Sequence, residues 1–76
     1  MSELILLDTK GMKCPLPVLK ARKAMKDVPP GGTLRVLATD PGAAKDFQHF
    51  CATTGCRLVS ASETAGVLEF IIEKPA

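Results

Sequence analysis

The run Pro29-Pro30-Gly31-Gly32 constrains the fold of this chain more than any other feature of its sequence. Proline and glycine are the strongest breakers of helices, so a helix that reaches this run must end there. The run is too short to link two domains. Because the 76 residues contain no tandem repeat and no low-complexity tract, we expect one domain over residues 1–76, with a modest core and no enclosed substrate cavity.

The first half of the chain predicts a strand, a helix and a second strand. The continuous apolar run 4–7 indicates the first strand, and the alternation of residues 33–39 beyond the break indicates the second. Between them, apolar residues recur at helical spacing. These residues are Val18, Ala21, Met25 and Val28.

The second half predicts another helix and then a hairpin. Asp40 is a suitable N-cap with Pro41 at the first helical position, and Gly55 is placed to end the helix. The runs 56–62 and 67–73 read as two strands joined by the turn Thr64-Ala65-Gly66. The apolar face of the helix is expected to carry Ala43, Phe47, Phe50, Cys51 and Thr54.

The resulting order βαβαββ predicts an α/β (α+β) two-layer sandwich. Right-handed crossovers place successive helices on the same side, so we expect a mixed four-stranded sheet with both helices on one face. The other face would be open, with Leu37 and Ile71 among charged neighbours and available to a partner.

The composition excludes several classes of protein. No apolar run is long enough to span a bilayer or to act as a signal peptide, so we expect a cytoplasmic protein without membrane contact. The net charge of +2 is too small to indicate nucleic-acid binding by itself. Basic residues nevertheless cluster around the first helix, either as a docking surface for an acidic partner or phosphate backbone, or merely as a solvated face. They are Lys10, Lys13, Lys20, Arg22, Lys23 and Lys26.

Cys14 is the first candidate for chemistry. It fits the N-cap of the first helix with Pro15 at the first helical position, although the helix could also start two residues later. The helix N-terminus and the preceding lysines would lower the pKa of this thiol. Asp8 and Asp40, which follow parallel strands and should lie at the same sheet edge, would raise it, so the sequence leaves the net direction open.

The surroundings of Cys14 favour a carrier over a redox enzyme. The prolines hold the thiol outward on a stiff turn, and neither a second cysteine nor a committed histidine lies nearby in the sequence. Such a residue suits carrying a group as a covalent adduct, although it could instead be a structural cysteine packed under a loop. Cys51 is expected in the core, and Cys56 is either half-buried and structural or a second relay thiol. His49 and Cys51 do not share a helical face, so we expect no metal site and no cofactor.

Three parts of the sequence together resemble the TusA/SirA-like sulfur-carrier family, and the resemblance covers nearly the whole chain. The first is the run from Leu7 to Pro17, which contains Gly11, Lys13 and the element Cys14-Pro15-Leu16-Pro17. The second is the run from Ala38 to Gly42, which includes Asp40, and the third is Asp46-Phe47 before Phe50-Cys51.

The resemblance implies a function, a site and partners. Cys14 would accept sulfur as a persulfide from a donor such as a cysteine desulfurase or a rhodanese-type protein and pass it to an acceptor sulfurtransferase. The protein would be a carrier in a relay rather than a stand-alone enzyme, serving transfer RNA thiolation, cofactor synthesis or the oxidation of reduced sulfur compounds. Pro15 and Pro17 would set the turn, and the basic helix would dock partners through Lys10, Lys20, Arg22, Lys23 and Lys26.

Two other functions compete with this interpretation. The basic helix could belong to a small RNA- or DNA-binding or regulatory module, but the chain has no Tyr or Trp and only three Phe, so stacking platforms are nearly absent and we expect no direct nucleic-acid binding. A thiol peroxidase or redox sensor would need Cys56 as the resolving thiol. The sequence contains neither a heptad repeat nor a strongly apolar sheet edge, so we expect a monomer.

Overall fold

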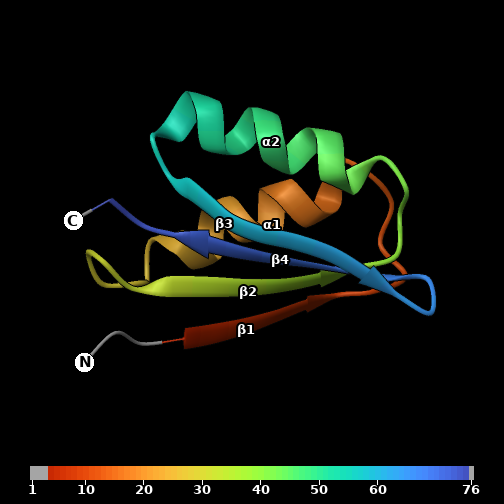
Figure 1. Cartoon of the computed structure of the whole chain (residues 1–76). Coiled ribbons are helices and arrows are strands. Elements are labelled where there is room, and N and C mark those ends of the chain that lie inside the picture. The colour runs from red at the N-terminus through yellow and green to blue at the C-terminus, as the bar shows by residue number, and fades with distance from the viewer. Residues whose placement is uncertain (1–3, 76) are drawn as a thin grey trace.

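A computed structural model describes residues 4–75 of the chain (Figure 1). It contains four strands and two helices in the order βαβαββ. The elements are β1 (Leu4–Thr9), α1 (Leu16–Met25), β2 (Thr33–Ala38), α2 (Ala43–Thr54), β3 (Arg57–Thr64) and β4 (Val67–Glu73).

The strands form one mixed sheet in the order β1-β2-β4-β3. β1 and β2 are parallel, because the chain between them crosses over through α1, whereas β4 is antiparallel to both of its neighbours. Both helices lie on one face of the sheet (Figure 1), as right-handed crossovers require. The predicted two-layer α/β fold is therefore confirmed.

The core lies between the sheet and the two helices. Its largest fully buried side chains come from both layers, and the Phe47 ring of α2 lies 4.8 Å from the Phe70 ring of β4, centroid to centroid. On β2 the buried residues alternate with half-buried ones, as the period of two predicts. Of the predicted α2 face, Thr54 alone is exposed, because it lies in the last turn beside the exposed Gly55.

Several boundaries differ from those predicted. α1 ends at Met25, so Val28 lies beyond the helix, although its side chain is buried as expected. β1 continues to Thr9 because the Thr9 hydroxyl donates to the carbonyl of Leu37 and allows a polar side chain to be fully buried. β3 begins at Arg57, one residue later than predicted, and runs on to Thr64.

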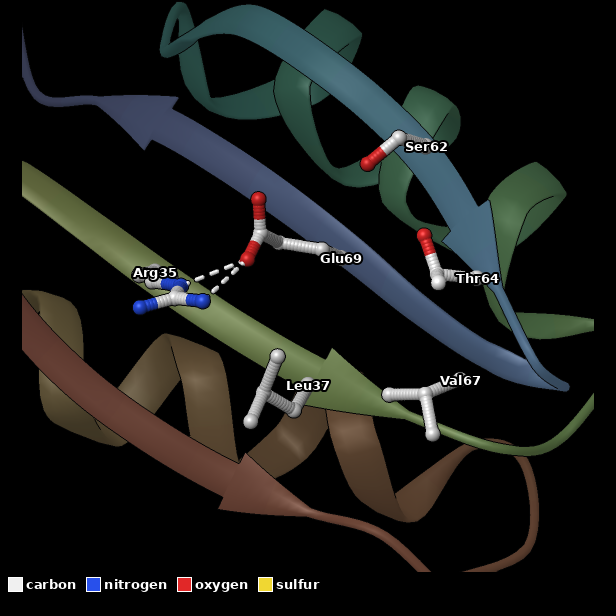
Figure 2. Close-up of a pocket in the computed structure, with 6 residues that line it drawn as sticks. All are labelled: Arg35, Leu37, Ser62, Thr64, Val67 and Glu69. Atoms are coloured by element: carbon white, nitrogen blue, oxygen red, sulfur yellow. Dashed lines mark hydrogen bonds and ion pairs between the residues drawn. The ribbon is translucent and has the colours of Figure 1, made fainter.

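The sheet face opposite the helices is uncovered among the described residues. Leu37 and Ile71 are half-buried there, and Leu37 borders a shallow pocket of about 330 Å³ (Figure 2). The guanidinium of Arg35 pairs across this face with the carboxylate of Glu69, with a nitrogen-to-oxygen distance of 2.5 Å. This ion pair neutralises the two charges of the pocket, so its floor is polar without a net charge.

Neither of the two helices in residues 4–75 is long and apolar enough to cross a membrane.

Candidate functional site: the Cys14 loop

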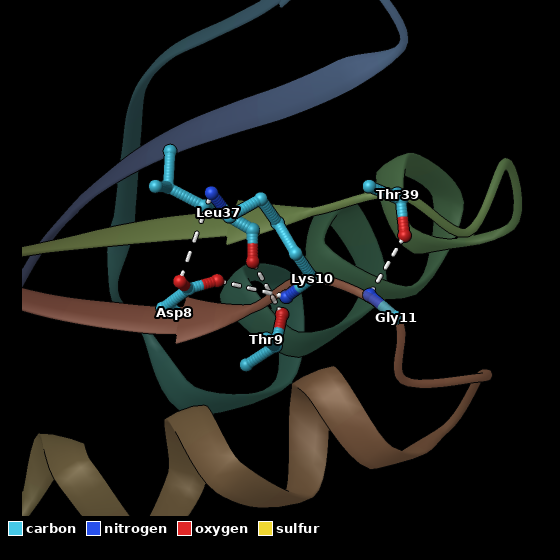
Figure 3. Close-up of polar contacts among 6 residues, drawn as sticks. All are labelled: Asp8, Thr9, Lys10, Gly11, Leu37 and Thr39. Carbon is cyan, nitrogen blue, oxygen red and sulfur yellow. Dashed lines mark hydrogen bonds and ion pairs between the residues drawn. The ribbon is translucent and has the colours of Figure 1, made fainter.

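The loop that carries Cys14 joins β1 to α1 and is fixed at its start by β2. The amide of Gly11 donates to the hydroxyl of Thr39, the residue after β2, at 2.9 Å (Figure 3). The amide of Met12 donates to the carbonyl of Thr9 at 3.1 Å. Gly11 has a φ of +83°, a left-handed conformation that side chains disfavour, which explains glycine at this position. The loop therefore leaves the sheet in one defined direction.

Asp40 ties the Cys14 backbone to the start of α2. One carboxylate oxygen, Oδ2, accepts the amide of Cys14 at 3.0 Å, and the other, Oδ1, accepts the amide of Gly42 at 2.7 Å. The predicted convergence of Cys14 and Asp40 at one sheet edge is therefore observed. Asp40 is not the N-cap of α2, because that position belongs to Gly42; its side chain instead closes a turn to the amide two residues ahead.

Cys14 itself is not the N-cap of α1. Pro15 occupies that position without a side-chain hydrogen bond, and Leu16 and the buried Pro17 are the first helical residues. The helix thus begins between the two starts that the sequence allowed, one residue after Pro15 and one before Pro17. The peptide bond between Cys14 and Pro15 is cis. Cys14 lies one residue before the cap, so its thiol does not contact the helix end as an N-cap would.

The Cys14 thiol meets a carboxylate from the other helix. Its Sγ is hydrogen-bonded to Oδ2 of Asp46, which lies in the first turn of α2. Gly42 lies beside both groups, since a Cβ there would make an ordinary contact of 3.7 Å with the sulfur and a tight contact of 3.2 Å with Oδ1 of Asp40. The half-buried sulfur is therefore enclosed on one side by the start of α2 and two acidic side chains.

Asp46 was not among the predicted site residues, although the pair Asp46-Phe47 contributed to the family resemblance. Its contact with Cys14 spans 32 positions of the sequence. A signal did exist, because Phe47 is a core residue of α2 and its helical neighbour Asp46 must therefore project beside the core rather than into it. The direction of α2 relative to the Cys14 loop, which decides the contact, could not be derived from that pattern.

The side of α1 that begins beside Cys14 is both apolar and basic. Leu16 and Leu19, three residues apart on the helix, are 47% and 53% exposed. Lys20 and Lys23 continue the same stripe at helical spacing and are exposed. We call these four residues the α1 stripe.

The other basic residues predicted for docking are also exposed. Arg22 places its guanidinium 5.6 Å from the ring centre of Phe50, on the side of α1 that faces α2. Together with Lys26 it borders a shallow pocket of about 170 Å³ near the C-terminal ends of both helices. Lys10 lies at the end of β1, where its ammonium is 3.8 Å from the Asp8 carboxylate. Lys13 precedes Cys14 and is exposed.

The other two cysteines are far from the Cys14 loop. Cys51 is buried in the last turns of α2, as predicted, and Cys56 is half-buried in the wall of the pocket near the C-terminal ends of the helices. Burial raises the pKa of the Cys51 thiol above its ordinary value of 9.0, and the neighbouring Cys56 raises it further. Within residues 4–75 no group of three or more His, Cys, Asp or Glu side chains is arranged to hold a metal ion.

The fold and the loop define a small α/β protein that presents one cysteine at the edge of its sheet. Residues 5–74 match the model of the family described as sulfurtransferase TusA. The sulfur carrier protein TusA of Allochromatium vinosum is 44% identical over 68 residues, which cover 90% of this chain and 90% of that protein. A protein of Neisseria meningitidis serogroup A is 49% identical over 67 residues, which cover 88% of this chain and 90% of that protein.

The fold has a counterpart among solved structures. The SirA-like protein of Desulfitobacterium hafniense superposes with a TM-score of 0.83 at 28% identity, covering 95% of this chain and 99% of that one. The chain therefore belongs to the sulfurtransferase TusA family. This membership supports a function of the TusA-like sulfur-carrier kind.

Proposed function

We propose that this protein carries sulfane sulfur as a persulfide on Cys14. The observation that carries the proposal is the geometry of the loop: the Cys14 amide is held by Asp40 at 3.0 Å while the sulfur stays half-buried at the sheet edge. The other two thiols lie near the opposite ends of the helices. A fixed, accessible thiol without a nearby resolving thiol suits a group that is carried and then handed on.

The transfer conserves sulfur and electrons without a cofactor. The Cys14 sulfur attacks the outer sulfur of a donor persulfide, forms a new S–S bond and releases the donor thiol, and the acceptor later repeats the step in the other direction. Gly11 and Pro17 fix the loop at either end, and Pro15 sets its turn. The backbone carbonyl of Lys13 accepts a hydrogen bond from the amide of Leu16 at 2.9 Å.

The partners we propose are a donor of the cysteine desulfurase or rhodanese type and an acceptor sulfurtransferase. The α1 stripe would dock them, because two exposed leucines supply apolar contact area next to the cysteine and two lysines supply charge. Lys10, Arg22 and Lys26 would attract an acidic partner surface from further away. All three Phe side chains are buried, which argues against base stacking and thus against a nucleic-acid-binding module.

The proposal places residues 1–76 as one monomeric carrier domain in the cytoplasm. Transfer RNA thiolation, cofactor synthesis and the oxidation of reduced sulfur compounds all use the same persulfide chemistry. The acceptor that takes sulfur from Cys14 therefore identifies the pathway.

The test is a loading experiment with a cysteine desulfurase and free cysteine, read by intact-protein mass spectrometry. The wild-type protein should gain one sulfur, and reduction should remove it. Cys14→Ser should gain none, whereas the matched control Cys56→Ser should load as the wild type does. Equal loading of Cys14→Ser and wild type would refute the assignment of Cys14.

A further inference from the structure

We propose that Asp46 sets the direction of sulfur transfer by stabilising the unloaded form of Cys14 over the persulfide. The inference rests on the proposed function and assigns a role to a side chain from the second helix. Asp46 contacts the reacting atom itself, since its Oδ2 is the hydrogen-bond partner of the Cys14 sulfur.

The charge of Asp46 is not neutralised by a cation. Among residues 4–75, the salt bridges join Lys10 to Asp8 and Arg35 to Glu69, and no lysine or arginine lies within ion-pair distance of Asp46. The carboxylate lies in the first turn of α2, where the helix macrodipole favours a negative charge. A second carboxylate, that of Asp40, is bonded to the amide of the same cysteine. The sulfur therefore faces negative charge that the protein itself supports.

The two forms of Cys14 respond to this environment in opposite ways. The unloaded thiol carries a proton and donates it to the Asp46 carboxylate, a charge-assisted hydrogen bond. In the persulfide, Sγ is bonded to Cβ and to the outer sulfur and has no proton to donate. A persulfide is also a stronger acid than its parent thiol and is an anion at neutral pH, so it meets repulsion where the thiol found an acceptor.

The step that this preference biases is balanced. The Cys14 thiol and a donor persulfide anion give the Cys14 persulfide anion and the donor thiol, so that one S–S bond breaks, one forms, and one proton moves to the departing sulfur. No oxidant or reductant is needed. Asp46 stabilises the Cys14 thiol on the reactant side of this equilibrium, and it does not stabilise the Cys14 persulfide on the product side. Cys14 is then a weak acceptor and a strong donor of sulfur, which suits a carrier that must hand its load on.

The equilibrium can be measured with a small donor in place of a protein partner. Reduced protein is equilibrated without oxygen in a fixed mixture of glutathione persulfide and glutathione, and the loaded-to-unloaded ratio is read by mass spectrometry. Because the same small molecules serve every variant, differences in the ratio report the preference of the protein alone. We expect Asp46→Asn and Asp46→Ala to raise the ratio about ten- to a hundredfold, the range of one hydrogen bond to a charged group. The ratio of Asp46→Glu, which keeps the negative charge, should lie between the ratios of these two variants and that of the wild type.

Asp8→Asn is the matched control. It removes the same charge at the same edge of the sheet, but Asp8 pairs with Lys10 and has no bond to the sulfur. Its ratio should stay within about twofold of the wild type, as expected for a screened surface charge. A merely structural role for Asp46 would lower the melting temperature without moving the ratio.

An unchanged ratio in both Asp46→Asn and Asp46→Ala, with folding verified by circular dichroism, would overturn the inference. An equal rise in Asp8→Asn would also overturn it, because general charge rather than contact would then be responsible. Failure of the proposed function looks different, since Cys14→Ser would then load as well as the wild type.

Discussion

Asp40, between β2 and α2, should be the residue on which the Cys14 loop depends most, and its contribution can be worked out from its contacts. Its two carboxylate oxygens accept the amides of Cys14 and Gly42 at 3.0 and 2.7 Å. Hydrogen bonds to charged groups contribute about 1.5–3 kcal/mol each. The bond to Gly42 is exposed, so water compensates much of its loss and about 1 kcal/mol is reasonable for it.

The expected order of stability is wild type, then Asp40→Asn, then Asp40→Ala. The alanine variant loses both acceptors, and its free energy of unfolding should fall by about 2.5–4 kcal/mol. The asparagine variant keeps one acceptor oxygen and should lose about half of that. For a domain of this size 1 kcal/mol corresponds to about 4–8 °C in melting temperature, so Asp40→Ala should melt at least about 10 °C lower.

Urea unfolding followed by far-ultraviolet circular dichroism measures these differences, since the chain has no tryptophan for fluorescence. Alkylation of Cys14 in the folded protein is a second readout, and it should accelerate in Asp40→Ala while alkylation of Cys56 stays unchanged. A loss of less than 1 kcal/mol in Asp40→Ala, or equal losses in the two variants, would show that the two bonds do not hold the loop.

Three further predictions concern the rest of the molecule. Phe47→Ala removes a fully buried ring and should lower the free energy of unfolding in urea by about 3–5 kcal/mol; a loss below 2 kcal/mol would contradict the described core. Gly55→Ala places a side chain at a φ of 78° and should cost about 1–2 kcal/mol in the same assay, whereas no loss would mean that α2 ends differently. Burial, and to a smaller extent Cys56, raise the pKa of Cys51 in the folded protein. The protonated Cys51 thiol therefore contributes fully to stability below the pKa of the unfolded chain, near 9.0, and this contribution is lost as the pH rises through the pKa of the folded protein. The melting temperature should therefore fall above pH 9, and Cys51→Ala should weaken that dependence; an unchanged pH profile in the variant would exclude this origin.

The order of elements and the layers could be predicted because each segment shows one clear periodicity. The break at 29–32 separates a period near 3.6 from a period of two, and β4 was predicted with the bounds that the structure shows. The ends of the helices and strands were less predictable, since they depend on single contacts between distant residues. β1 reaches Thr9 because the Thr9 hydroxyl finds the carbonyl of Leu37, 28 positions away.

In the candidate site, too, some contacts could be predicted from the sequence and others could not. The rule for parallel strands brought Asp40 to the Cys14 loop, and the structure places its carboxylate on the Cys14 amide. The same rule suggested that Asp8 opposes the cysteine, but Asp8 pairs with Lys10 instead. The carboxylate that does contact the sulfur is Asp46, whose position depends on how α2 packs above the sheet, and no local pattern encodes that angle.

The position of β4 has a consequence for how the chain matures on the ribosome. β4 is the last strand to be synthesised, yet it lies inside the sheet between β2 and β3 (Figure 1). Until residues 67–73 leave the exit tunnel, β2 and β3 have no common partner and both present open edges to other nascent chains. Folding should therefore be completed only after residues 67–73 have left the tunnel, and a chain truncated before Val67 should aggregate more than the full chain.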